Sequence, residues 1–327
     1  MDRAVGSTER YLGTRLMLIC PLCRAAVSVT ADRAFCTDEK CIYADQEFPM
    51  IDGQPVLIDF LDSIFQRSNY SEGNGSPISR DLSRTRLRSR LHRLADGGNP
   101  VAAKNCESFI ALTKAQNARP RVLVVGGGSV GKGAENLYRD ADVELTGTDV
   151  YASPCTSLLC DAHKLPFESN TFDGVWVQAV LEHVLDPHVV VAEIHRVLKA
   201  NGLVYAETPF MQQVHLGRFD FSRFTHLGHR RLFSGFVELE SGLACGPGMA
   251  LAWSYMYFLL SFSRSKTIRR LLKVFAMITS FPLKYFDYYL ADKPAALDAA
   301  SGYYFLGKKA NLPLSDRDLI RLYMGAF

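Results

Sequence analysis

Short apolar runs alternate with segments of helical periodicity along most of the chain after residue 120. The run RVLVV at 121–125 has no polar interruption, which predicts a strand buried on both faces of a sheet. Residues 189–198 instead carry apolar side chains at helical spacing. Strands that alternate with helices predict an α/β fold with a doubly wound, mostly parallel sheet. The predicted strands are 121–125, 143–150, 172–179, 203–209 and 301–309.

The chain divides into three parts by composition. Residues 1–61 contain four of the eight cysteines and predict a small, β-rich N-terminal domain. Residues 62–100 are polar and rich in arginine, which predicts a basic linker. The main domain covers 101–327, begins with a helical segment at 101–118, and contains a hydrophobic and basic insertion at 246–300.

The overall composition is that of an ordinary globular protein. Of 327 residues, 48% are hydrophobic and 22% are charged, which excludes a disordered or collagen-like chain. The net charge of +3 does not predict a polyanion-binding protein, so nucleic acid is not an expected partner. The N-terminus lacks the apolar stretch of a signal peptide, and no apolar run is long enough to span a membrane. We therefore expect a cytoplasmic protein.

A glycine-rich loop follows the first predicted strand of the main domain. Its six residues, GGGSVG at 126–131, fit the pattern G-x-G-x-x-G and lead into a helix. Glycines let the backbone approach a ligand closely, and the start of the helix offers free N–H groups. About 20 residues later Asp149 ends the second strand, where a carboxylate can accept hydrogen bonds from ribose hydroxyls. The loop predicts a site for either NAD or S-adenosylmethionine.

Four downstream motifs favour S-adenosylmethionine. They are CDAHKLPF at 160–167, FDGV at 172–175, AVLEHV at 179–184 and EIHRVLKANG at 193–202. Together with the glycine loop, this run resembles class I S-adenosylmethionine-dependent methyltransferases with a UbiE-like (type 11) methyltransferase domain. The resemblance covers roughly 121–240, with the late strand as its probable end, and implies a Rossmann-like sheet.

The resemblance also implies a role for each matching position. The glycines would line the methionine and ribose end of the cofactor. Asp149, at the end of the second strand, would bind the ribose, and Asp161 with Ala162 would bind adenine. The implied cofactor-binding residues are Gly126, Gly127, Gly128, Gly131, Asp149, Val150, Asp161, Ala162, Gln178 and Ala179. Val124 stands where the family usually has an acid, and Val130 where it usually has its third glycine. NAD therefore stays open as an alternative.

Candidate catalytic residues follow the fourth and fifth strands, where ligands bind in such sheets. Methyl transfer depends mainly on orientation, and a base is needed only when the acceptor is protonated, as a hydroxyl is. A segment at 211–230 that is rich in histidine, arginine and phenylalanine predicts an acceptor-binding lid, and local capping and pairing is its structural alternative. The candidate catalytic residues are His183, His215, His226 and Glu207.

The expected reaction moves a methyl group from S-adenosylmethionine to an unidentified acceptor, with oxygen as the preferred acceptor atom. The acceptor is expected to be a small molecule or to be linked to a lipid or glycan. Two alternatives stay open. One is an NAD(P)-dependent oxidoreductase, and the other is a non-catalytic module that uses the same fold to dock a partner.

The four N-terminal cysteines have the spacing of a zinc site. They follow the pattern C-x2-C-x12-C-x4-C, and four thiolates complete a tetrahedral, structural zinc site. The segment FPMIDGQPVL at 48–57 resembles the end of small Trm112-like zinc ribbons. A reduced, metal-free ribbon is the alternative. The predicted ligands are Cys20, Cys23, Cys36 and Cys41.

The insertion combines aromatic and basic residues. Residues 241–286 contain no aspartate or glutamate but several lysines and arginines among tryptophan, tyrosine and phenylalanine. The favoured interpretation is a buried helical insertion that helps to build the acceptor pocket. This mixture is also typical of an element that lies at a membrane surface, so a peripheral membrane contact through 246–290 is the alternative.

Overall fold

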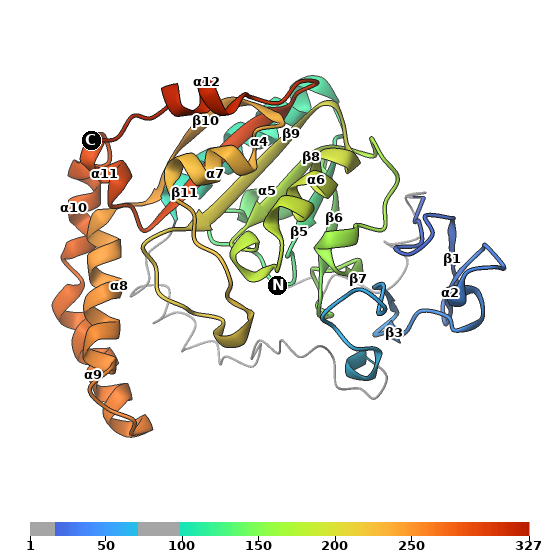
Figure 1. Ribbon diagram of the computed structural model, residues 1–327, viewed down its shortest axis with the longest axis horizontal. Coiled ribbons are helices and arrows are strands. Elements are labelled where there is room, and N and C mark those ends of the chain that lie inside the picture. The colour runs from blue at the N-terminus through green and yellow to red at the C-terminus, as the bar shows by residue number, and fades with distance from the viewer. Residues whose placement is uncertain (1–16, 71–98, 327) are drawn as a thin grey trace. The chain divides into compact units, whose positions relative to one another are not determined.

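Figure 1 shows the computed structural model, which describes residues 17–70 and 99–326. Most of the predicted linker, 71–98, lies outside the described residues. The chain forms two compact units. The first contains the described residues up to Trp176 together with His188–Leu203, and the second contains Val177–Pro187 and the chain from Val204 onward. The predicted domain boundaries at residues 61 and 100 stay a prediction.

The first unit is built on a mostly parallel sheet, as predicted. Its central strands are β5 (Arg121–Val125), β6 (Glu144–Asp149), β7 (Leu158–Cys160) and β8 (Phe172–Gln178), in the order β8-β5-β6-β7. Strands β5 and β6 run parallel, with Val122 opposite Leu145. The side chains of β5 and β8 are almost all buried, which explains the uninterrupted apolar run at 122–125 in β5 and the apolar run at 175–177 in β8.

The N-terminal segment extends this sheet by two strands. Strand β4 (Gln54–Leu57) runs parallel to β7, with Val56 opposite Leu159, and β3 (Met50–Ile51) pairs antiparallel with β4. All four residues of β4 are buried. Gln54 also donates to the carbonyl of Ser153 at 2.9 Å. The predicted N-terminal domain therefore contributes strands to the sheet of the main domain, which the sequence pattern did not predict.

The cysteine-containing part of this segment is a small ribbon. Strands β1 (Val27–Val29) and β2 (Ala34–Cys36) form an antiparallel pair, followed by the short helix α2 (Ile42–Asp45) and, later, the 3-10 helix η1 (Arg67–Tyr70). Tyr43 stacks on Phe48 with ring centroids 4.4 Å apart. The buried apolar core of the ribbon is small, with Ile19 and Ala34 beside this aromatic pair, which favours a metal as a further cross-link.

Helices of the first unit begin and end where the sequence provides caps. Helix α4 (Pro100–Gln116) begins after Asn99, whose side chain accepts from the backbone N–H of Ala102. Its Phe109 meets Trp176 of β8 edge to face, with ring centroids 5.5 Å apart. The other helical elements are α5 (Glu135–Arg139), η2 (Ala162–Lys164) and α6 (Pro187–Val197).

The second unit contains a long antiparallel pair of strands. Strand β11 (Gly302–Lys309) lies between β10 (Phe236–Cys245) and β9 (Leu198–Pro209), and β10 and β11 are antiparallel. Strand β11 confirms the predicted late strand, whereas β10 was not predicted. Strand β9 already begins at Leu198, because Asn201, with φ of 66°, is accommodated within it instead of forming a separating turn.

The insertion is helical. Its elements are α8 (Pro247–Leu260), α9 (Lys266–Ser280), α10 (Leu283–Leu290) and α11 (Pro294–Asp298). Further helical elements of this unit lie outside the insertion: η3 (Leu181–His183), η4 (Gly217–Phe219), α7 (His226–Leu232) and α12 (Asp316–Arg321). Helix α8 packs against α9 and α10 (Figure 1). The Asp287 carboxylate accepts from the N–H groups of Gly248 (2.6 Å) and Met249 (3.0 Å) and so caps α8. None of the helices in the described ranges has the length and apolarity needed to cross a membrane.

Candidate functional site

The glycine loop is held closely against the end of β6. The N–H of Gly127 donates to the carbonyl of Thr148 at 2.8 Å, and Gly126 has a left-handed φ of 71°. A Cβ atom on Gly128 would overlap the ring of Tyr151. Glycine is therefore required at 126 by its backbone conformation and at 128 by space.

Asp149 closes this loop through two backbone hydrogen bonds. Its Oδ2 accepts from the N–H of Gly128 at 2.8 Å, and its Oδ1 accepts from the N–H of Val150 at 2.7 Å. Tyr70 donates to the carbonyl of Val150 at 3.0 Å. Asp149 thus fixes the backbone of the glycine loop against the end of β6. Gly126, Gly127, Gly128, Asp149 and Val150 are thus brought together, and Gly131 follows them in the same loop.

Asp161 is a buried carboxylate at the carboxyl end of β7. It accepts from Ser63 Oγ at 2.5 Å, from His163 Nδ1 at 2.5 Å and from the His163 N–H at 3.0 Å. Burial alone would raise the pKa of Asp161, but the hydrogen bonds from His163 and Ser63 lower it below its usual range. The ionised carboxylate keeps about one lone-pair site for a further donor. Ala162 is buried next to it.

Ser63 belongs to the N-terminal segment, so residues far apart in the sequence build this part of the site. Further contacts join the same two regions. Lys164 donates to Asp59 Oδ2 at 2.7 Å, and Arg24 lies 3.3 Å from Glu193. No signal in the sequence predicted these pairings, because each joins residues about 100 or more positions apart.

Gln178, Ala179 and Glu207 lie together in the second unit. The N–H of Ala179 donates to the carbonyl of Glu207 at 3.0 Å, and Gln178 Nε2 donates to Glu207 Oε2 at 2.9 Å. Tyr205 donates its hydroxyl to Glu207 Oε1 at 2.5 Å. Ala179 has a left-handed φ of 54°, a strained conformation for a residue with a Cβ atom. Strain of this kind clusters at functional sites, which makes this strand end a candidate site.

His183 and His215 come together around Glu182. Their rings meet edge to face with centroids 4.9 Å apart. Glu182 Oε1 lies 3.6 Å from His183 Nε2 and 3.8 Å from His215 Nε2. The Glu182 side chain is 1% exposed, and burial raises its pKa to about 8. The sequence placed Glu182 after the fourth strand but gave no reason to single it out, because its surroundings arise only in the folded unit.

His226, the third candidate histidine, lies in a different environment. It is in α7, its ring packs against Tyr303, and its Nε2 is 3.5 Å from Ser241 Oγ. Burial lowers its pKa. Its contacts are those of a packed core histidine, and its catalytic role stays a prediction.

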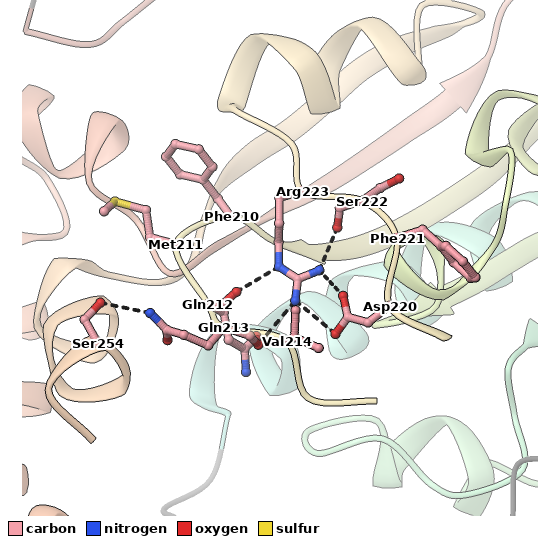
Figure 2. A pocket seen from close by; sticks show the side chains of 10 residues that line it. All are labelled: Phe210, Met211, Gln212, Gln213, Val214, Asp220, Phe221, Ser222, Arg223 and Ser254. Atoms are coloured by element: carbon pink, nitrogen blue, oxygen red, sulfur yellow. Dashed lines mark hydrogen bonds and ion pairs between the residues drawn. The ribbon is translucent and has the colours of Figure 1, made fainter. Parts of the chain in front are cut away.

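A cavity of about 450 Å³ lies along the predicted acceptor-binding segment. Figure 2 shows its lining: Phe210, Met211, Gln212, Gln213, Val214, Asp220, Phe221, Ser222, Arg223 and Ser254. The Arg223 guanidinium donates to both oxygens of Asp220 and to the carbonyl of Gln212. Burial opposes ionisation of Asp220, but hydrogen bonds from Arg223 and His215 lower its pKa to about 2. The cavity therefore offers apolar walls with one neutralised ion pair.

The four predicted zinc ligands form one cluster. Their Sγ atoms all lie within 4.8 Å of one another, with Cys20–Cys41 at 3.8 Å and Cys23–Cys36 at 3.4 Å. Disulfide sulfurs are only about 2.05 Å apart. A zinc ion with bonds of about 2.3 Å holds tetrahedral thiolates about 3.8 Å apart, which these separations approach. The cluster therefore fits a structural zinc ion, held by all four thiolates.

Comparison with known proteins agrees with the resemblance drawn from the motifs. Residues 123–206 match the model of the family described as "Methyltransferase domain". The chain is 36% identical over 109 residues to the ubiquinone/menaquinone biosynthesis C-methyltransferase UbiE of Desulfotalea psychrophila, covering 33% of this chain and 37% of that protein. It is 48% identical over 48 residues to UbiE of Burkholderia multivorans, covering 15% and 20%.

Solved structures are similar to a lesser degree. A putative sarcosine dimethylglycine methyltransferase from Galdieria sulphuraria has 17% identity and a TM-score of 0.43, over 64% of this chain and 85% of that chain. Of the two UbiE proteins, the chain spans little more than a third of the first and a fifth of the second. The matched segment runs from the glycine loop to β9, and the predicted methyltransferase resemblance is confirmed over that segment.

Proposed function

We propose that this chain is an S-adenosylmethionine-dependent methyltransferase. The observation that carries the proposal is the glycine loop, which Asp149 closes through the N–H of Gly128 inside the segment that matches the methyltransferase domain. A loop of this kind presents backbone N–H groups, and a carboxylate at the end of the second strand is the position that binds ribose hydroxyls in such folds. Asp161, with one remaining lone-pair site, is proposed to accept from the adenine amino group.

The acceptor is proposed to bind in the cavity beside Asp220 and Arg223. When bound, S-adenosylmethionine supplies an electrophilic methyl group, and the chain's own task is then to orient the acceptor and exclude water. The apolar walls suit the body of a small or lipid-linked molecule. A hydroxyl acceptor must also lose a proton. His183 and His215 are the candidate bases beside the cavity. His215 lies 3.4 Å from Asp220, which lines the cavity, and the His183 ring packs against the His215 ring.

Helix α9 supports an acceptor that is presented at a membrane surface. Its exposed apolar residues recur at helical spacing along one face: Ile268, Leu271, Phe275 and Ile278. Lysines and arginines lie between them, and residues 241–286 contain no acid. A helix face with four exposed apolar residues, flanked by lysines and arginines, fits an anionic lipid surface. We therefore propose a peripheral membrane contact through α9 and its neighbours, and a cytoplasmic location.

Calorimetric titration of the purified chain tests the central proposal. S-adenosylmethionine, S-adenosylhomocysteine and NAD are titrated in parallel. We expect both adenosyl ligands to bind with micromolar affinity and NAD not to bind. Binding of NAD alone would overturn the proposal in favour of an oxidoreductase. Binding of none of the three would favour the alternative of a non-catalytic docking module.

A further inference from the structure

Three potential metal ligands converge in the second unit, away from the cysteine cluster. A carboxylate oxygen of Glu182 and one ring nitrogen each of His183 and His215 all lie within 4.8 Å of one another. The two imidazoles come from different places, since His183 ends η3 and His215 lies in the loop before η4. The three residues are therefore brought together by the fold and are not neighbours merely by sequence.

The hydrogen bonds of the two imidazoles determine which nitrogen faces Glu182. His183 Nδ1 lies 2.8 Å from the carbonyl oxygen of Phe219, which can only accept, so Nδ1 carries the proton. His215 Nδ1 lies 3.4 Å from Asp220 Oδ2 and 3.4 Å from the carbonyl of Gln213. In both rings Nε2 then presents a lone pair toward Glu182 Oε1. Metal-binding histidines typically have this arrangement, with the other ring nitrogen donating to a carbonyl or carboxylate.

Glu182 adds the third lone pair, on a carboxyl group whose ionisation burial disfavours until a bound cation compensates the charge. Its side chain is 1% exposed, and among the described residues neither of its oxygens has a hydrogen-bond partner. A buried carboxylate without hydrogen bonds costs several kcal/mol unless a cation neutralises it. A single proton does not bridge the cluster, because 3.6 and 3.8 Å exceed hydrogen-bond length.

We propose that Glu182, His183 and His215 bind a divalent first-row transition-metal ion. At tetrahedral angles, the separations of 3.6 and 3.8 Å between Glu182 Oε1 and the two Nε2 atoms correspond to bonds of about 2.2–2.3 Å, close to the about 2.0–2.2 Å of zinc–nitrogen and zinc–oxygen bonds. Two imidazoles and one carboxylate suit zinc, iron or a similar ion and leave at least one coordination position open. His215, 26% exposed at its side chain, marks the open side.

The position of the site connects it to the cavity. The carbonyl of Glu182 accepts from the N–H groups of Phe221 and Ser222, which line the cavity wall. Asp220 lines the cavity too and orients His215. With both histidines serving as ligands and not as bases, the ion would hold and acidify an acceptor hydroxyl at the open position, and the proton would pass to solvent; this consequence rests on the proposed function. Metal binding itself is measured without substrate and does not depend on that function.

The test uses the full chain, stripped by a strong chelator and then equilibrated with Co²⁺. Metal content and the absorption spectrum are read together, because thiolate ligands give an intense near-ultraviolet charge-transfer band and an N2O site does not. We expect the wild-type chain to retain one equivalent of Co²⁺ beyond the thiolate-bound one. Glu182→Gln and His215→Ala should each lose that equivalent, with more than about 100-fold weaker binding, and keep the charge-transfer band.

Two controls make the outcome decisive. His188→Ala removes an exposed histidine of α6 that belongs to neither cluster and should retain both equivalents. Circular dichroism of every variant in chelator checks that the fold is kept, and if Glu182→Gln misfolds, the His215→Ala variant, whose side chain is less buried, carries the test. The proposal is overturned if the wild-type chain holds no Co²⁺ beyond the thiolate cluster, or if folded His215→Ala retains the second equivalent.

Discussion

Asp149 and Asp161 in the first unit accept several hydrogen bonds each, whereas Glu182 in the second unit accepts none from the described residues. All three carboxylates lie at or just after the carboxyl end of a strand, and burial disfavours ionisation of Asp161 and Glu182. Donors from the chain compensate for burial at Asp161, and its pKa is lowered. At Glu182 they do not, and its pKa rises to about 8.

The two metal-ligand clusters differ in the same way. Four thiols in the first unit form a closed set that can satisfy a zinc ion completely, while Glu182, His183 and His215 form an open set of three. Closed sites stabilise folds, and open ones leave a position for water or substrate. The contrast indicates that the first unit is preorganised to hold its ligands, whereas the second unit leaves polar groups to be completed by what binds there.

The largest expected effect follows from opening the closed cluster. Cys20→Ser should release zinc and lower the free energy of unfolding by about 3 kcal/mol or more, a decrease in melting temperature of about 6–12 °C. The reason is that the cluster cross-links a ribbon whose own aromatic core is small and whose chain continues into β4. Zinc content and thermal unfolding measure the change.

Cys155→Ser is the matched control, because Cys155 lies in the same unit but outside the cluster. It should keep the metal and most of the stability. A wild-type chain that carries no zinc, and whose melting temperature is unaffected by chelators, would contradict a structural role for the cluster.

An intermediate effect is expected at the carboxylates of the first unit. Asp149→Ala removes the ribose acceptor and the anchor of the glycine loop, so the dissociation constant for S-adenosylmethionine should rise about 30- to 150-fold, or about 2–3 kcal/mol. Asp161→Asn should weaken binding about tenfold. The substitution keeps the shape of the side chain, but its amide group would place N–H donors against the donors of Ser63 and His163. Calorimetry measures both values.

Asp142→Ala controls for a general change of charge. Asp142 is exposed and pairs with Lys114, so its removal should leave the affinity unchanged. If both site variants bound S-adenosylmethionine as tightly as the wild-type chain, the assignment of the cofactor site would be wrong.

The sequence predicted the features that depend on local pattern and failed where distant segments meet. Strand β5 follows from an uninterrupted apolar run, β6, β8 and β11 follow from short segments rich in β-branched and aromatic residues, and the glycine loop follows from its spacing. The pairing of β4 with β7 was not predictable, because a run of four residues carries no information about its partner. The bond from Ser63 to Asp161 and the isolation of Glu182 likewise arise only when the units fold.

Spacing can indicate a metal site only when its ligands are close in sequence. The cysteine pattern was readable because the first two thiols are separated by only two residues and the whole set by about twenty. His215 lies more than thirty residues after Glu182, and no periodicity relates them. Sequence analysis therefore selected both histidines as single candidates but missed the carboxylate between them.

The smallest expected effect extends the contrast to the surface of the second unit. Ile278 is 70% exposed on α9, so Ile278→Ser should change the free energy of unfolding by less than about 0.5 kcal/mol. If that face contacts lipid, the same substitution removes about 1 kcal/mol of binding free energy, because less apolar surface is buried in the membrane. Binding to anionic vesicles should then be about fivefold weaker in sedimentation assays. Leu312→Ser, at an 82% exposed position outside the helical insertion, should leave vesicle binding unchanged. Equal binding of the wild-type chain and both variants would mean that the exposed face of α9 is completed by something other than a membrane.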